Sequence, residues 1–186
     1  MSKLQIPPNE ALYPVPVVLV SCLDKANKRA NIITIAWCGV VASQPPQISV
    51  SIRPSRHSHA LITAERSFVI NIPTRRIMEK ADLCGILSGS KTDKFKACSF
   101  TAVPASKVSA PMIQECPVNI ECTLKDVLTL GSHDVFIGEV VAVHADTSVV
   151  DDKGRIDYGK TEPFVFNQGE YWDLGKKIGF YGCSSK

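Results

Sequence analysis

Polar side chains that can hold a phosphate group gather in the first third of this 186-residue chain. Ser51 and Arg53 alternate with apolar residues, as on the polar face of a β-strand. Ser58 follows shortly afterwards, precedes a helical run over residues 59–65, and is a good N-cap for that helix. A helix N-terminus has unpaired N–H groups that attract anions, and nearby arginines strengthen the attraction. The segment therefore predicts a phosphate site where a strand is followed by a helix.

Other residues are candidates for contacts to a flat ligand. Trp37 and Phe166 are core residues by default, but aromatic rings near strand ends also line clefts and stack on planar groups. Asn71 interrupts an apolar strand, so its amide, if buried, needs a partner from either the backbone or a ligand. Lys94 lies in a flexible Gly- and Ser-rich loop that can bring it onto an anion, and His133 lies at a predicted hairpin tip. Together these residues suit a phosphorylated planar cofactor that supplies the reaction chemistry itself.

Several other chemistries lack their residue patterns. Residues 85–92 differ from the phosphate loop of nucleotide hydrolases, because Ser90 replaces the glycine before the lysine and a helix precedes the segment. His57 and His59 have chelating spacing but no accompanying carboxylates, so no metal site is predicted. No nucleophile motif, paired-acid signature or dinucleotide fingerprint can be identified, so no catalytic residue is assigned.

The composition is that of an ordinary globular protein. A net charge of +3 with scattered lysines and arginines argues against nucleic acid as a partner. The longest apolar stretch, residues 32–42, is far shorter than the roughly 20 residues of a membrane span, and prolines occupy the place of a signal peptide's apolar region. Seven cysteines without a Cys-x-x-Cys pair predict neither a disulfide framework nor a metal cluster. We therefore expect a cytoplasmic protein without a membrane partner.

Alternation of apolar and polar residues predicts a mainly β chain with a few short helices, in a single domain over residues 1–186. Thr74 is predicted to cap a second helix over residues 75–84, with Gly85 as its C-terminal stop. Many antiparallel strands with few helices favour a closed or partly open barrel over a doubly wound sheet. The predicted strands are residues 15–23, 32–40, 47–52, 68–72, 118–128, 135–145 and 163–166.

Successive segments of the chain resemble, in order, the flavin reductase-like FMN-binding split barrels, most closely their flavoredoxin branch. The segments are NIITIAW at residues 31–37, SVSIRPSRHS at 49–58, FVIN at 68–71, SGSKTDKF at 88–95, APMI at 110–113, GSHDVFIGEV at 131–140 and GEYW at 169–172. The resemblance implies an antiparallel Greek-key split β-barrel of six strands with small helices. It also implies one non-covalently bound FMN per subunit and a homodimer with the flavin near the subunit interface.

The resemblance also assigns roles by position. The strand over residues 31–37 would lie along the flavin ring, residues 51–58 would meet the ribityl chain and phosphate, and Lys94 would be a mobile cation. His57 departs from the aromatic residue usual at that position. The implied FMN contacts are Asn31, Thr34, Ala36, Trp37, Ser51, Arg53, Ser58, Asn71, Lys94, His133 and Phe166.

Three functions follow from these expectations. The favoured one is an electron carrier that keeps its FMN and exchanges electrons with redox partner proteins such as ferredoxin-like carriers. The second is an enzyme of the same fold that uses NAD(P)H to reduce free flavin or a ferric complex. The third, a non-redox interaction module, would leave the polar strand faces and the phosphate-friendly helix start without a role.

Overall fold

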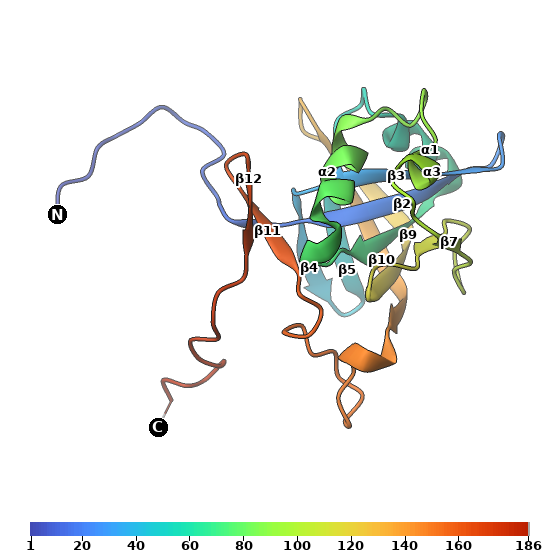
Figure 1. Cartoon of the computed structure of the whole chain (residues 1–186). Helices are drawn as coiled ribbons and strands as arrows, with labels where there is room; N and C mark the ends of the chain where they lie inside the picture. Colours follow the sequence, from blue (N-terminus) through green and yellow to red (C-terminus); the bar gives the residue numbers. More distant parts are fainter. Residues whose placement is uncertain (186) are drawn as a thin grey trace.

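Antiparallel strands form most of the computed structural model, which describes residues 1–185 (Figure 1). The mainly β class with a few short helices, predicted from the alternation, is confirmed. The strands are β1 (Val15–Pro16), β2 (Val18–Asp24), β3 (Arg29–Ile35), β4 (Cys38–Ser43), β5 (Pro46–Ile52), β6 (Ser67–Ile72), β7 (Ala102–Val103), β8 (Met112–Ile113), β9 (Val118–Thr129), β10 (Asp134–Ala145), β11 (Phe164–Asn167) and β12 (Glu170–Asp173). The helices are α1 (His57–Glu65), α2 (Met78–Ile86) and α3 (Lys94–Ala97), with 3-10 turns η1 (Arg75–Ile77) and η2 (Thr147–Val149).

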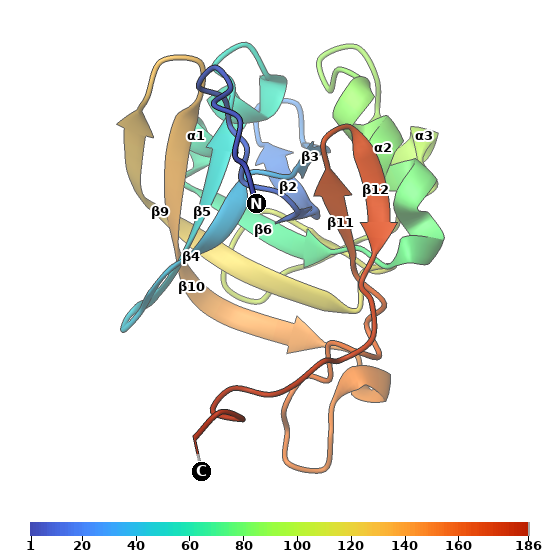
Figure 2. The same cartoon turned by 90° about the vertical axis from the view of Figure 1, so that its left-hand side faces the viewer.

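Within residues 1–185, seven strands form one antiparallel sheet in the order β3-β2-β6-β9-β10-β5-β4. Figure 2 shows these strands curving around a common interior. Strand β6 follows β5 in the chain but lies between β2 and β9, a non-adjacent connection of the Greek-key kind. The implied six strands become seven because the predicted strand 32–40 divides into β3 and β4 at Ala36 and Trp37.

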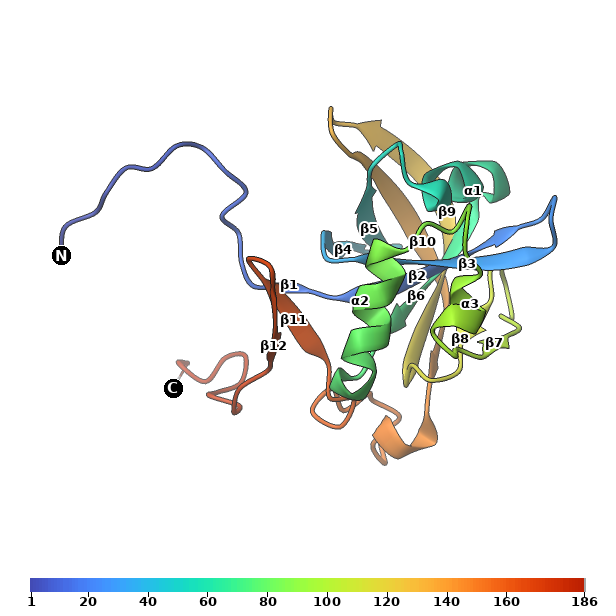
Figure 3. The same ribbon diagram turned by 45° about the horizontal axis from the view of Figure 1, so that its top comes forward.

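Strand β2 is buried on both faces, which explains its nearly continuous apolar sequence. Val20 points into the barrel and packs in the same cluster as Phe136. Leu19 points the other way, into a second cluster with Ala81 of α2 and Phe95 of α3. Helices α2 and α3 therefore cover the outer face of β2 and β3, as Figure 3 shows.

Both predicted helix boundaries require correction. Helix α1 begins at His57 with Arg56 as its N-cap, so the prediction of Ser58 as the N-cap is wrong. Gly85 lies inside α2 and does not end it. A Cβ at Gly85 would lie 3.3 Å from Cβ of Thr34, so this glycine permits close packing of α2 on β3.

Two smaller sheets complete the described chain. Strands β1, β11 and β12 form a three-stranded sheet, and β7 and β8 form a hairpin. The segment before β1 extends away from the barrel and is almost entirely exposed (Figure 1). Among residues 1–185, no helix has the length and apolar character needed to cross a membrane.

Candidate ligand-binding site

Two adjoining cavities lie where α1, the edge strand β3 and the hairpin tip between β9 and β10 meet. The larger cavity has a volume of about 800 Å³ and the smaller about 240 Å³. Ile33, Arg53 and Arg56 line both cavities, which therefore form one pocket with a large lobe and a small lobe. The size is that of a site for a cofactor or another small molecule.

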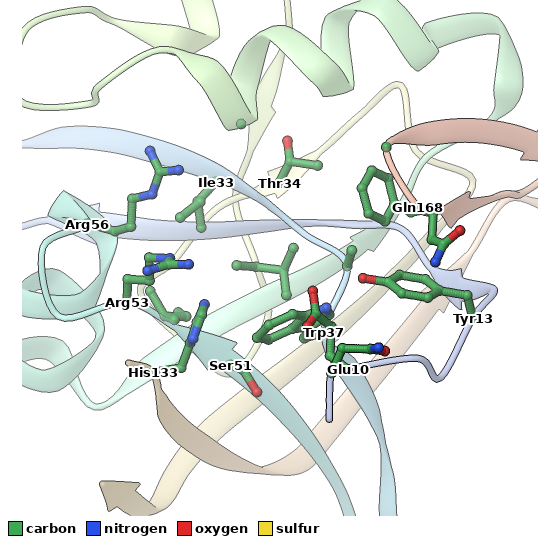
Figure 4. Close-up of a pocket in the computed structure, with 17 residues that line it drawn as sticks. Glu10, Tyr13, Ile33, Thr34, Trp37, Ser51, Arg53, Arg56, His133 and Gln168 are labelled. Carbon is green, nitrogen blue, oxygen red and sulfur yellow. The ribbon is translucent and has the colours of Figure 1, made fainter. Parts of the chain in front are cut away.

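The large lobe has aromatic walls and one polar edge (Figure 4). At one end the ring of Trp37 lies 4.6 Å from the ring of His133, and at the other Tyr13 lies 6.2 Å from Phe166. Strand β3 is at one edge of the seven-stranded sheet, so in the described part of the chain its outer backbone groups have no partner in that sheet. Thr34 and its neighbours bring this edge into the lobe, where it can hydrogen-bond the rim of a flat polar ligand.

The small lobe lies between the start of α1 and the loop that joins α2 to α3. Its walls include Ser58 from the first turn of α1 and Gly89 from the loop. Among residues 1–185, no side chain caps the N-terminus of α1. The backbone N–H of His59 donates to the carbonyl oxygen of Arg56 at 2.9 Å, which leaves the N–H groups of His57 and Ser58 for a ligand. Such a helix N-terminus favours an anion.

Three cationic side chains, Arg53, Arg56 and Lys94, line the small lobe. In the part of the chain that the structure describes, none of them forms an ion pair with a carboxylate. Lys94 is only 4% exposed, and its Nζ donates a hydrogen bond to the carbonyl oxygen of Cys84 at 2.7 Å. Burial lowers the pKa of Lys94, and the positive charge of Arg56 adds to this lowering. A bound anion would relieve this uncompensated charge, so the small lobe fits a phosphate group.

His133 reaches the large lobe from the tip of the hairpin. Burial lowers its pKa, with a further contribution from the positive charge of Arg53, so the neutral imidazole is favoured near pH 7. Its ring can therefore stack and hydrogen-bond without adding charge. The hairpin is tied to α1 by His59, whose Nε2 lies 2.7 Å from Oδ2 of Asp134.

The structure brings most of the predicted site residues to this pocket. The large lobe is lined by Thr34, Ala36, Trp37, Ser51, His133 and Phe166, the small lobe by Ser58 and Lys94, and both lobes by Arg53.

Asn31 lies directly behind the small lobe. It is 2% exposed, and its Nδ2 donates a hydrogen bond to Oγ of Ser58 at 2.7 Å. Its amide carbon and oxygen also lie so close to Gly89 that a Cβ there would overlap them. Asn31 therefore packs against both walls of the small lobe, the one that contains Ser58 and the one that contains Gly89.

Asn71 lies outside both lobes. Its Nδ2 donates to the carbonyl oxygen of Leu19 at 2.9 Å, and its Oδ1 accepts from the backbone N–H of Ile113 at 2.9 Å. The side chain of Asn119 donates to the same oxygen at 2.8 Å. The amide is thus used to join strands inside the protein, and the structure does not bring Asn71 to the site.

The expectation of Lys94 as a mobile cation also requires correction. It is the first residue of α3 and is buried, because α3 packs against β3 and brings Phe95 into the second core cluster. The side chain of Lys94 therefore lines the small lobe from a fixed, buried position.

Sequence reasoning missed several lining residues. Arg56 stands two residues before Ser58, and its charge was a usable signal. Glu10, Tyr13 and Gln168 also line the large lobe, although they come from segments far away in the chain. Local periodicity carries no information about such distant contacts.

Comparisons with known proteins agree with this architecture. Residues 11–175 match the family model of the flavin reductase like domain. The structure is similar to flavoredoxin of Desulfovibrio vulgaris (Miyazaki F), with 35% identity, a TM-score of 0.93 and full coverage of both chains. It is also similar to flavoredoxin from Methanosarcina acetivorans, with 29% identity, a TM-score of 0.92 and coverage of 100% of this chain and 98% of the other.

A third structure shares the fold at lower identity. It is an FMN-binding protein from Thermus thermophilus, with 24% identity, a TM-score of 0.80 and coverage of 97% of each chain. This similarity shows that the two chains share one fold. The chain belongs to the flavin reductase-like domain family.

Proposed function

We propose that the chain binds one FMN non-covalently in the two-lobed pocket and transfers electrons through it to or from redox partner proteins. The proposal rests on one observation: a small lobe, whose cationic side chains have no carboxylate partner among the described residues, opens into a large lobe with aromatic walls. FMN has matching parts, a phosphate monoester connected by a ribityl chain to a planar ring. The similarity to two flavoredoxins supports the carrier role.

The residues of the pocket divide between the parts of the cofactor. Arg56, Lys94 and the first turn of α1 would hold the phosphate, because they combine positive charge with free N–H groups. Arg53 lies on the wall shared by both lobes and would meet the ribityl chain. Trp37 and His133 would cover the ring.

Bound FMN supplies one- and two-electron transfer, and the protein tunes its potential and access. Arg53 places positive charge in the large lobe and so favours the more negative, reduced cofactor. The outer backbone groups of β3 can orient the polar edge of the ring. Trp37 remains 38% exposed, which leaves a route for electrons to a docked partner.

A second candidate is an NAD(P)H-dependent flavin or ferric reductase of the same fold. A neighbouring cavity of about 690 Å³ supports it, because Trp37 and Ser51 line both this cavity and the large lobe. A second planar ligand such as a nicotinamide would have room there beside the ring.

We also propose that the protein is a homodimer in which a second copy covers the open side of the large lobe. Exposed apolar side chains near this side support the proposal, namely Leu12 on the N-terminal segment and Val40 and Val41 on β4. Sedimentation velocity would give the mass of a dimer, whereas a monomer at all concentrations would contradict the proposal.

The function is tested by the visible spectrum of the purified protein and by anaerobic reduction. A yellow protein that is bleached by a reduced ferredoxin, but not by NADH or NADPH, would support the carrier. Rapid bleaching by a pyridine nucleotide, with turnover of added FMN or ferric chelate, would support the reductase. A colourless protein that binds no added FMN would overturn both.

Gly89→Ala is expected to weaken FMN binding at least about tenfold, the equivalent of one lost hydrogen bond to a charged group. A Cβ at Gly89 would overlap the amide of Asn31 and lie 3.2 Å from Cδ2 of His57, so the loop or the Asn31 side chain must shift at the wall of the small lobe. Fluorescence titration of FMN measures the change. Gly39→Ala is the matched control, because a Cβ there meets nothing within 4 Å, and equal affinities for both variants would contradict the assignment.

A further inference from the structure

Two buried thiols face each other beside the small lobe. Cys84 lies on α2 and Cys98 directly follows α3, and their sulfur atoms are 3.4 Å apart. Cys84 is 0% exposed and Cys98 is 3% exposed. Both belong to the second core cluster, between the helices and the outer face of β2 and β3. The FMN site described above does not use either thiol.

The chain between these cysteines forms one wall of the small lobe. It contributes Leu87, Ser88, Gly89 and Lys94 to the lining. The two ends are already connected through the hydrogen bond from Nζ of Lys94 to the carbonyl oxygen of Cys84. A covalent link between the thiols would therefore close a loop around residues that hold the anion.

We propose that Cys84 and Cys98 form a redox-sensitive pair whose disulfide closes the segment 85–97 against the small lobe. A disulfide needs a sulfur separation of about 2.0 Å, so the two sulfurs must approach by a little over an ångström. This movement of the sulfurs draws the last turn of α2 toward the C-terminal end of α3. The two helices are neighbours in Figure 3. The remaining buried cysteines have a packing role.

Hydrogen peroxide is the class of oxidant that the reaction needs. Cys98, the less buried residue of the two at 3% exposed, attacks first, and the O–O bond breaks to give a sulfenic acid and water. The sulfur of Cys84 then attacks the sulfenic sulfur, the S–O bond breaks, and a second water leaves. The two thiols lose two protons and two electrons in total, and one peroxide is reduced to two waters.

The predicted effect on the cofactor rests on the proposed FMN function. A closed loop has fewer conformations available, so less ordering is needed to hold the phosphate. FMN release from the oxidised protein is therefore expected to be slower by up to about tenfold, the factor for ordering one or two side chains in advance.

Peptide mapping without reductant tests the disulfide and requires no bound flavin. The exposed Cys183 is first replaced by serine to prevent links between molecules. After peroxide treatment, trypsin should release residues 81–91 linked to residues 97–107, with the mass of two hydrogen atoms lost. The linked pair should be absent in Cys84→Ser and present in Cys116→Ser, a control from the same buried cluster.

Oxidation of the thiols to sulfinic acids without a link, or a link from Cys84 to Cys116, would overturn the proposal. Stopped-flow fluorescence of FMN release then compares the oxidised and reduced forms, with Cys84→Ser expected to be insensitive to peroxide. Equal release rates in the linked and reduced forms would overturn the closure of the lobe. A protein that never binds FMN would instead remove the proposed function, while the peptide map still decides the disulfide.

Discussion

Lys94→Met is expected to weaken FMN binding by about 10- to 100-fold, the range for loss of a hydrogen bond between charged groups. Lys94 is 4% exposed, and within residues 1–185 the only hydrogen bond of its ammonium group is to the carbonyl oxygen of Cys84. Methionine keeps the length of the side chain and removes the charge. Fluorescence titration with FMN gives the affinity.

The same substitution should leave the stability of the FMN-free protein unchanged or raised, because it removes a buried charge that has no carboxylate partner. Because the FMN affinity falls while the stability does not, this one variant distinguishes an effect on binding from an effect on folding. Lys96→Met is the control, since Lys96 lies on the same short helix with its side chain 87% exposed. A loss of affinity shared by both variants, or a collapse of stability in Lys94→Met alone, would refute the role of Lys94 in phosphate binding.

Glu121→Gln is expected to lower the free energy of unfolding by about 3 kcal/mol, as for other buried charged networks that lose one member. The carboxylate of Glu121 is 0% exposed and accepts hydrogen bonds from the backbone N–H groups of Ser106, Lys107 and Val108. It also accepts from Oγ of Ser106 at 2.8 Å and lies 2.6 Å from Nε2 of His144. A glutamine amide would turn an NH₂ group toward some of these donors. Urea unfolding at pH 7 measures the change.

The stabilisation by Glu121 should also depend on pH. Burial alone would raise the pKa of Glu121, but hydrogen bonds from Ser106, His144 and Lys107 outweigh it and lower the pKa from 4.5 to about 2. Because the folded-state pKa is depressed, the contribution is complete above pH 4.5 and is lost as the pH falls from there toward 2. The stability difference between wild type and Glu121→Gln should therefore shrink at pH 3.

Glu139→Gln provides the matched control for this pair of measurements. Glu139 lies on the adjacent strand β10 and pairs with Lys125 at 2.9 Å, with its side chain 29% exposed. A pair so near the surface contributes at most about 1 kcal/mol. If Glu121→Gln lowered the free energy of unfolding no more than this control does, the buried carboxylate would have no special role in holding residues 106–108 to the barrel.

Local sequence patterns were enough to predict the fold class and the polar strand of the site. Alternation with a period of two identified the strands, and it also placed Ser51 and Arg53 on one face, where the structure has both in the pocket. The strand predicted over residues 15–23 is divided in the structure into β1 and β2. These features follow from backbone geometry, which repeats over a few residues.

The sequence by itself therefore determined a mainly antiparallel barrel, its hairpins and the segments that supply the site. Only the tertiary structure decided that Asn31 supports Ser58 while Asn71 joins strands, that Lys94 is buried, and that Cys84 faces Cys98. Burial and hydrogen-bond partners depend on which distant segments pack together, and a local pattern holds no record of that packing.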